Sequence, residues 1–258
     1  SKRIYRAREK IRIEQITLEV PESPELPVRL DAVLKSLYLL FNEGYNSSHP
    51  DNLIRKDLCE EAIRLCFLLT QNNLTRLPRT YALLALMHFQ ASRLNSRIDN
   101  KGHIILLKYQ DRSSWNHALI QKGFELLELA SEPFETSTYH FEAAIASLHA
   151  AAPSMELTDW KSIYHLYELL YQFQPNPVIA LNKAIASAYA ISKQNAMDEL
   201  KQVKGLENHH LYYASLGEIC FELQRWSEAR TYFEQALQLF PVKCLYIFPI
   251  FAVCNWWK

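Results

Sequence analysis

Residues 210–241 read HLYYASLGEICFELQRWSEARTYFEQALQLFP, and this stretch decides the fold of the chain. Apolar residues recur at three- and four-residue steps in both of its halves, which predicts two helices joined by a short polar connection. Gly217 and Ala229 are small enough for the two helices to approach closely, and Phe233 fills the space between them. Pro241 lacks the backbone N–H that a further helical turn needs, so it ends the second helix.

The spacing of these residues resembles the tetratricopeptide repeat, a helical hairpin that stacks into arrays. The positions that fit are Leu216, Gly217, Ala229, Phe233, Ala236 and Pro241. Tyr213 stands at the first aromatic position, where the repeat has tryptophan, and Cys220 replaces the usual tyrosine. One repeat earlier, Ala184, Ala196 and Leu200 fit the same template loosely. The resemblance implies a protein-interaction scaffold, a class in which catalysis is uncommon.

The composition extends the helical prediction to the whole chain. Only 5 of the 258 residues are glycine, whereas about 7% is usual. The glycine-rich motifs G-x-x-x-x-G-K-[ST] and G-x-G-x-x-G, which bind phosphate groups, do not occur in the sequence. We therefore expect an all-α array of helical hairpins, a right-handed solenoid, with one short irregular segment near 99–112.

Local signals place the individual helices. The helix starts that they predict are Val28, Asp51 or Asn52, Pro78, and Ser113 or Ser114. Further helices are predicted over 137–151, 159–173, 177–191, 196–203, 209–223 and 227–239. Between them, 99–102 has the composition of a turn and 103–107 is consistent with a short extended piece.

The cysteine content and the hydropathy pattern indicate a cytoplasmic protein. The five cysteines are Cys59, Cys66, Cys220, Cys244 and Cys254. An odd number without a C-x-x-C motif fits reduced thiols that pack on apolar helix faces. No apolar segment follows the basic first residues, and no run of about 20 apolar residues occurs, so neither a signal peptide nor a membrane span is expected.

Catalytic or metal-binding patterns are weak, so we expect neither an enzyme nor a cofactor. His209 and His210 are adjacent on a helix and point in different directions. His140 and His149 lie near Glu142 but lack the H-E-x-x-H spacing of zinc enzymes. Packed or exposed histidines explain these residues better than metal ligands do.

Two polar clusters, LFNEGYNSS (40–48) and YQDRSSW (109–115), stand out from the helical pattern. Their candidate residues are Asn42, Glu43, Tyr45, Gln110, Asp111, Arg112 and Trp115. In one interpretation Asn42, Glu43, Asp111 and Arg112 form a paired polar network that fixes the packing of neighbouring helices. In the other, the clusters form a pocket for a small ligand or for a peptide of a partner. The structural interpretation is favoured.

These clusters also belong to a resemblance that covers nearly the whole chain. The motifs that carry it are LPVRLDAVLKSLYLLFNEGY, RKDLCEEAIRL, QDRSSWNHALI, AAIASLHAAAPSMELTDW and NPVIALNKAIA. In this order they resemble the long C-terminal extension of a group of bacterial extracytoplasmic-function sigma factors. Sigma factors are subunits of RNA polymerase. One of their domains melts the −10 element of promoter DNA and another reads the −35 element. The resemblance implies RNA polymerase core and promoter DNA as partners of the full-length protein.

The N-terminal stretch SKRIYRAREKIR (1–12) then resembles the end of the helix that reads the −35 element. It holds six basic residues and one acidic residue, whereas the rest of the chain holds 22 basic and 27 acidic residues. The resemblance places Lys2, Arg3 and Arg6 against DNA in the full-length protein. Because most of the DNA-binding domain lies outside this sequence, we expect no promoter binding by this chain alone.

The expected organisation has three parts: the truncated DNA-reading helix at 1–12, a linker at 13–27, and a tetratricopeptide-like domain at 28–258. The prolines of the linker exclude a continuous helix, and its short length keeps the two flanking parts at high effective concentration. The last residues, VKCLYIFPIFAVCNWWK (242–258), depart from the family pattern because apolar and aromatic residues replace the usual charged helix.

The resemblance implies a regulatory domain that binds the protein's own sigma domains, a regulatory protein or the polymerase. Two other hypotheses remain open. The chain could be a free-standing tetratricopeptide-type adaptor, which sigma-type sequence upstream of Ser1 would exclude. It could also be a helical enzyme, which would require Glu43, Asp111 and Arg112 to meet around an open cavity.

Overall fold

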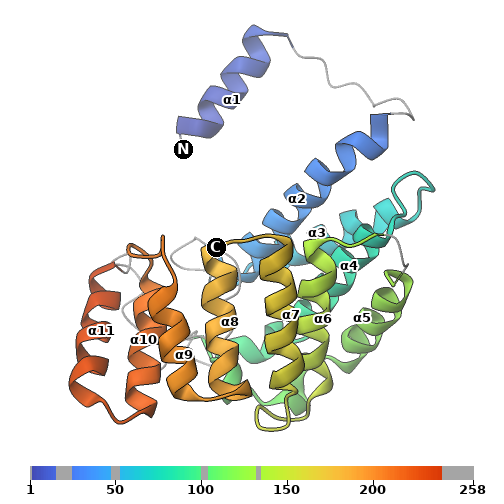
Figure 1. Cartoon of the computed structure of the whole chain (residues 1–258). Coiled ribbons are helices and arrows are strands. Elements are labelled where there is room, and N and C mark those ends of the chain that lie inside the picture. Colours follow the sequence, from blue (N-terminus) through green and yellow to red (C-terminus); the bar gives the residue numbers. More distant parts are fainter. Residues whose placement is uncertain (1, 16–24, 48–52, 100–103, 132–134, 240–258) are drawn as a thin grey trace.

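The computed structural model describes residues 2–15, 25–47, 53–99, 104–131 and 135–239. Within these ranges the chain forms eleven α-helices and short 3₁₀ turns. The single strand-like feature found there is an isolated antiparallel bridge between Ile98 and Ile104. The all-α fold and its irregular segment are therefore confirmed (Figure 1).

The helices follow one another with short connections. Their bounds are α1 Lys2–Ile13, α2 Leu26–Tyr45, α3 Lys56–Thr70, α4 Pro78–Ala91, α5 His117–Leu129, α6 Thr138–Ala151, α7 Trp160–Phe173, α8 Pro177–Ala190, α9 Lys193–Gln202, α10 His210–Glu222 and α11 Trp226–Leu239. Three 3₁₀ turns, η2 Leu94–Arg97, η3 Leu107–Tyr109 and η4 Arg112–Ser114, lie between α4 and α5.

Most predicted helix starts agree with the structure, and side-chain caps explain why. Asp159 and Asn176 each accept a hydrogen bond from a backbone N–H in the first turn of α7 and α8. Three predicted starts are wrong. The helix predicted over 196–203 begins at Lys193, because Ser192 caps it. The helix placed at Asp51 or Asn52 begins at Lys56, and those two residues lie outside the described ranges.

The helix start predicted at Ser113 or Ser114 is also wrong, since Asn116 caps α5. The Asn116 Oδ1 atom accepts from the Leu119 N–H at 3.1 Å. Ser113 instead donates its backbone N–H to Asp111 Oδ1 at 2.9 Å. This bond holds Ser113 in the separate turn η4, because a short Asp side chain satisfies the nearby backbone without a helix.

The helices pack as antiparallel neighbours in chain order. Helices α2 and α3, α4 and α5, α7 and α8, and α10 and α11 form hairpins, and α6 packs between α4 and α7. Helix α4 is the most deeply buried, since ten of its fourteen residues are buried. One apolar core extends from α2 to α8 and a second from α8 to α11, so α8 joins the two parts of the array.

Two glycines allow helices to approach more closely than any larger residue would. A Cβ atom on Gly217 in α10 would lie 2.7 Å from two ring carbons of Phe233 in α11. A Cβ atom on Gly123 in α5 would lie 2.6 Å from a ring carbon of Phe89 in α4. The same device, glycine beneath a phenylalanine ring, therefore closes a hairpin in each half of the array.

The ends of the chain are described only in part. Residues 1, 16–24 and 240–258, which include Pro21, Pro24, Pro241 and the predicted divergent terminus at 242–258, lie outside the described ranges. Helix α2 begins at Leu26, so Pro27 lies in its first turn rather than in the linker predicted to end there. Among the described helices, none has the length and apolar character that crossing a membrane requires.

Candidate functional site

The first polar cluster surrounds the C-terminal end of α2. The guanidinium of Arg97, which is only 1% exposed, donates to the backbone carbonyl of Tyr45 and, at 2.6 Å, to Asn46 Oδ1. It also lies 3.6 Å from the centroid of the Tyr45 ring. The carbonyl end of a helix carries partial negative charge, so a buried cation there is stabilising. Tyr45 thus serves as part of a helix cap.

The second polar cluster surrounds the C-terminal end of α6. Arg112 Nη1 donates to the carbonyls of His149 at 2.9 Å and Ala152 at 3.0 Å. Arg93 and Arg112 place their guanidinium groups 5.6 and 5.3 Å from the ring of buried Trp115. Arg112 therefore performs for α6 the role that Arg97 performs for α2, and the segment between α4 and α5 supplies both arginines.

The four residues proposed as one paired network lie in different surroundings. Asp111 Oδ1 accepts from the backbone and the hydroxyl of Ser113, at 2.9 and 2.6 Å. These hydrogen bonds lower the pKa of the exposed Asp111 carboxyl. Asp111 and Arg112 thus direct their side chains to different partners, although they are adjacent in sequence. Gln110 is also buried and donates to the Ile105 carbonyl at 2.7 Å.

Asn42 and Glu43 line a pocket of about 360 Å³ between α2, α6 and the start of α8. The residues that line it are Lys35, Tyr38, Leu39, Asn42, Glu43, Thr138, Tyr139, Glu142, Gln174, Asn176, Val178 and Ile179. Asp111 and Arg112 are not among these described lining residues. Glu43, Asp111 and Arg112 therefore do not converge in the way that the proposed helical enzyme requires.

Glu142 is the most unusual group of the pocket. Its side chain is 5% exposed, and Oε2 has no hydrogen-bond partner among the described residues. Burial raises the pKa of Glu142 well above its ordinary value, and contact with Tyr38 and the charge of Lys35 offset only part of that effect. The Tyr38 hydroxyl also has its pKa raised, first by burial and then by the nearby Glu142 charge.

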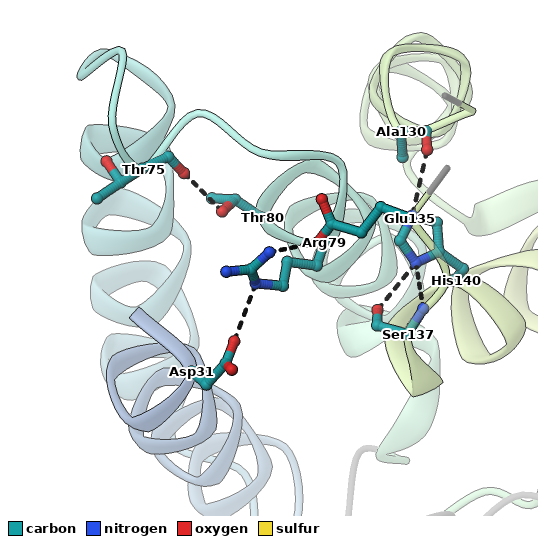
Figure 2. A network of polar contacts seen from close by, with 8 residues as sticks. All are labelled: Asp31, Thr75, Arg79, Thr80, Ala130, Glu135, Ser137 and His140. Carbon is teal, nitrogen blue, oxygen red and sulfur yellow. Dashed lines mark hydrogen bonds and ion pairs between the residues drawn. The ribbon is translucent and has the colours of Figure 1, made fainter. Parts of the chain in front are cut away.

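A network around Arg79 connects α4 to α2 and to the segment just before α6 (Figure 2). Arg79 in α4 pairs with Asp31 in α2 at 2.9 Å and with Glu135, just before α6, at 2.5 Å. The His140 ring contacts the Ser137 backbone N–H at 3.0 Å and the Ala130 carbonyl at 3.2 Å. These contacts position the first turn of α6, which contributes Thr138 and Tyr139 to the pocket.

Other expected residues serve packing. Cys59 and Cys66 are fully buried, and burial raises the pKa of each thiol to about 12, which disfavours the reactive thiolate. His149 is buried with its ring 5.2 Å from that of Trp160. Burial, followed by the charges of Arg93 and Arg112, lowers the pKa of His149 to about 3.

The tetratricopeptide positions lie at the α10–α11 contact. Leu216, Gly217, Ala229 and Ala236 are buried, and Phe233 packs against the same cores. Pro241 lies outside the described residues.

The predicted DNA-facing residues lie on α1. Arg6 is exposed, and the side chains of Lys2 and Arg3 lie outside the part that the structure describes. Figure 1 shows α1 apart from the helical array.

Arg93 and Arg97 were not predicted as site residues from the sequence, and Glu142 was predicted only as a neighbour of histidines. A buried charge has no signature in hydropathy, because its apolar neighbours in space come from distant helices. One signal was available for Glu142: it occupies a position in the apolar stretch FEAAIASL (141–148), where a charge is unexpected.

Comparison with known proteins adds two matches to this geometry. Residues 29–131 match a family of unknown function (DUF6596), and residues 210–241 match the tetratricopeptide repeat. The second match coincides with the stretch that decides the fold. The first spans both polar clusters.

The chain is also similar to a curated protein. The chain is 36% identical over 238 residues to an uncharacterized protein of Rhizobium meliloti (strain 1021). The alignment covers 92% of this chain and 56% of the relative, so the chain spans little more than half of that protein's length. No solved structure matches the chain. The chain is thus a helical array with one tetratricopeptide repeat.

Proposed function

We propose that this chain is the C-terminal regulatory domain of a bacterial sigma factor and controls transcription initiation through protein–protein contacts. The single observation that carries the proposal is the helical array that ends in a tetratricopeptide repeat at 210–241. Such arrays present extended surfaces to other proteins, since each repeat packs only on its neighbours. On this proposal the domain is not an enzyme and acts in the cytoplasm.

Three further findings support the assignment to a sigma factor. The family matched over 29–131 is found in sigma-factor-like proteins. The relative from Rhizobium meliloti is much longer than the matched region, which leaves room for sigma domains in a protein of this type. The basic residues of α1 resemble those at the end of a −35-reading helix in their spacing.

The proposed mechanism is intramolecular. Residues 1–12 end the DNA-reading domain, and the connection to α2 tethers the array to it. A tether of this length gives a high effective concentration, so a weak interface between the array and the sigma domains or the polymerase is sufficient for control. Promoter DNA contacts only the full-length protein, through residues that include Lys2, Arg3 and Arg6.

The test deletes residues 28–258 from the full-length protein and measures run-off transcription from its promoters together with binding to a −35 duplex. We expect a changed transcript yield and unchanged duplex binding. The matched control replaces Lys2, Arg3 and Arg6 with alanine, which is expected to weaken duplex binding and leave the array intact.

Unchanged transcription after the deletion would refute the regulatory role and favour a free-standing adaptor. Binding of the isolated chain to a −35 duplex at micromolar concentration and physiological salt would refute the proposal that promoter DNA contacts only the full-length protein.

A further inference from the structure

The pocket between α2 and α6 has the features of a site for a small ligand group. Its volume of about 360 Å³ lies at the lower end of the roughly 300–1,000 Å³ typical of ligand sites. Leu39, Val178 and Ile179 supply apolar lining, and polar groups occupy the rest of the lining. The pocket is built by side chains from three helices, so its shape is fixed by the packing of the array.

One carboxyl oxygen of Glu142 in this pocket lacks a hydrogen-bond donor among the described residues. Glu142 is only 5% exposed, and its Oε2 atom has no hydrogen-bond partner among the described residues. A buried carboxyl oxygen that lacks a hydrogen-bond partner carries a desolvation cost that a hydrogen-bonded one does not. A donor that enters the pocket would remove this cost, and a cationic donor would remove the larger cost of ionising Glu142 in an apolar environment.

Two aromatic rings lie beside the carboxyl. The Tyr38 and Tyr139 rings are 5.6 Å apart, with an angle of 50° between their planes, and both line the pocket. The faces of such rings attract organic cations, with a preference for positions within about 6 Å of a ring centroid. A carboxyl group flanked by two tyrosines is therefore suited to an ammonium or a guanidinium group.

The charges on the rim also favour a cation. The charged groups that line the pocket are Lys35, Glu43 and Glu142, two acidic and one basic. The connection between α7 and α8 contributes the amide side chains of Gln174 and Asn176, and the first turn of α8 contributes the apolar side chains of Val178 and Ile179. An anionic ligand would meet two carboxyl groups, whereas a monocation would give the pocket a net charge near zero when Glu142 is ionised.

We infer that this pocket binds a guanidinium or primary ammonium group, with Glu142 as its ion-pair partner and the Tyr38 and Tyr139 rings beside it. The group belongs either to a small amine or to an arginine or lysine side chain of a partner protein, which share this chemistry. The inference does not depend on the sigma-factor assignment, because it rests on the pocket alone.

The test measures binding of n-butylguanidinium to the purified chain by calorimetry, with n-butylurea as the neutral isostere. We expect a dissociation constant in the millimolar range or below for n-butylguanidinium and at least tenfold weaker binding for n-butylurea. A blocked tripeptide, acetyl-Ala-Arg-Ala-amide, distinguishes the two sources: binding tighter than that of n-butylguanidinium indicates a protein side chain, and weaker binding indicates a free small molecule.

Two variants assign the binding to the pocket. Glu142→Gln keeps the shape of the side chain and is expected to weaken n-butylguanidinium binding at least tenfold. Glu60→Gln removes an exposed carboxylate on α3, outside the pocket lining, and is expected to leave binding unchanged. Any of three results would overturn the inference. They are equal affinities for n-butylguanidinium and n-butylurea, equal affinities of Glu142→Gln and the unmodified chain for n-butylguanidinium, and no binding at 10 mM probe.

A measurement on the unmodified chain guards against misfolding of the variant. Because burial favours the neutral carboxyl, binding of the cation should release a proton from Glu142, and affinity should rise as the pH increases above 4.5. The other titratable groups that face Glu142 are Lys35, Tyr38 and Glu43 on α2 and Tyr139 on α6. Calorimetry in buffers of different ionisation enthalpy measures the release, and its absence would contradict the ion pair.

Discussion

The contact between Gly217 and Phe233 gives the sharpest prediction about the fold. In Gly217→Ala, the new methyl group would lie 2.7 Å from two ring carbons and 3.1 Å from a third. Ordinary contacts between carbon atoms are about 3.5–4.0 Å, so the Phe233 ring must move by close to 1 Å or the helices must separate. Overpacking of this kind costs about 1–3 kcal/mol.

Helix propensity acts in the opposite direction. Replacing glycine by alanine in the interior of a helix stabilises it by about 1 kcal/mol. Over most of its range the cost of overpacking exceeds the gain in helix propensity. We therefore expect Gly217→Ala to lower the free energy of unfolding by about 1 kcal/mol. Phe233→Leu removes the ring, and in the double variant the alanine should stabilise relative to Phe233→Leu alone.

Urea unfolding followed by circular dichroism measures these differences, and hydrogen exchange of α10 and α11 localises them, since repeat arrays can unfold in parts. Our reasoning predicts a change of sign for the effect of alanine at position 217 between the two backgrounds. A stabilising Gly217→Ala substitution, or additive effects of the two substitutions, would refute the proposed contact.

Three further predictions concern buried polar groups. Arg112→Met removes the two hydrogen bonds to the end of α6 and should destabilise the chain by about 2–3 kcal/mol, whereas Asp111→Ala removes only an exposed turn cap and should destabilise it much less, both measured by urea unfolding. Since the folded-state pKa of Glu142 is raised, the unmodified chain should lose stability relative to Glu142→Gln as the pH rises above 4.5; parallel stability curves would contradict this. His149 has a lowered pKa of about 3, so its contribution should be present above pH 6.5 and lost as the pH falls towards 3, and His149→Gln should reduce this acid sensitivity in thermal melts.

The helices could be predicted because their signals are local. Apolar periodicity and first-turn residues such as Asp159 and Asn176 place α7 and α8 within a residue of their observed starts. The start of α5 was missed because Ser113, Ser114 and Asn116 are all good cap residues. The Asp111 side chain accepts a hydrogen bond from Ser113 and holds it in a 3₁₀ turn, so Asn116 caps the helix instead. Competition between equivalent local caps is not resolved by sequence spacing alone.

The polar sites depend on contacts between distant parts of the chain. Arg97 and Arg112 each contact the end of a helix that lies 37 or more residues away. The charged residues next to Arg97 and Arg112 in the sequence do not indicate that these arginines contact the ends of distant helices. The pocket likewise joins α2 to residues more than 90 positions further along the chain, so its Glu142 could be recognised only once the array was assembled.

The central claim is that this array is the interaction domain of a sigma factor, and equilibrium binding tests it most directly. Labelled residues 1–258 are titrated with polymerase core that carries the upstream sigma domains, and fluorescence anisotropy reports the complex. The account predicts saturable binding with a dissociation constant of about 10 μM or below, equivalent to a binding free energy of roughly −7 kcal/mol or more favourable. Unlabelled chain should displace the labelled chain from the complex. Anisotropy that stays flat up to tenfold higher concentration would contradict it.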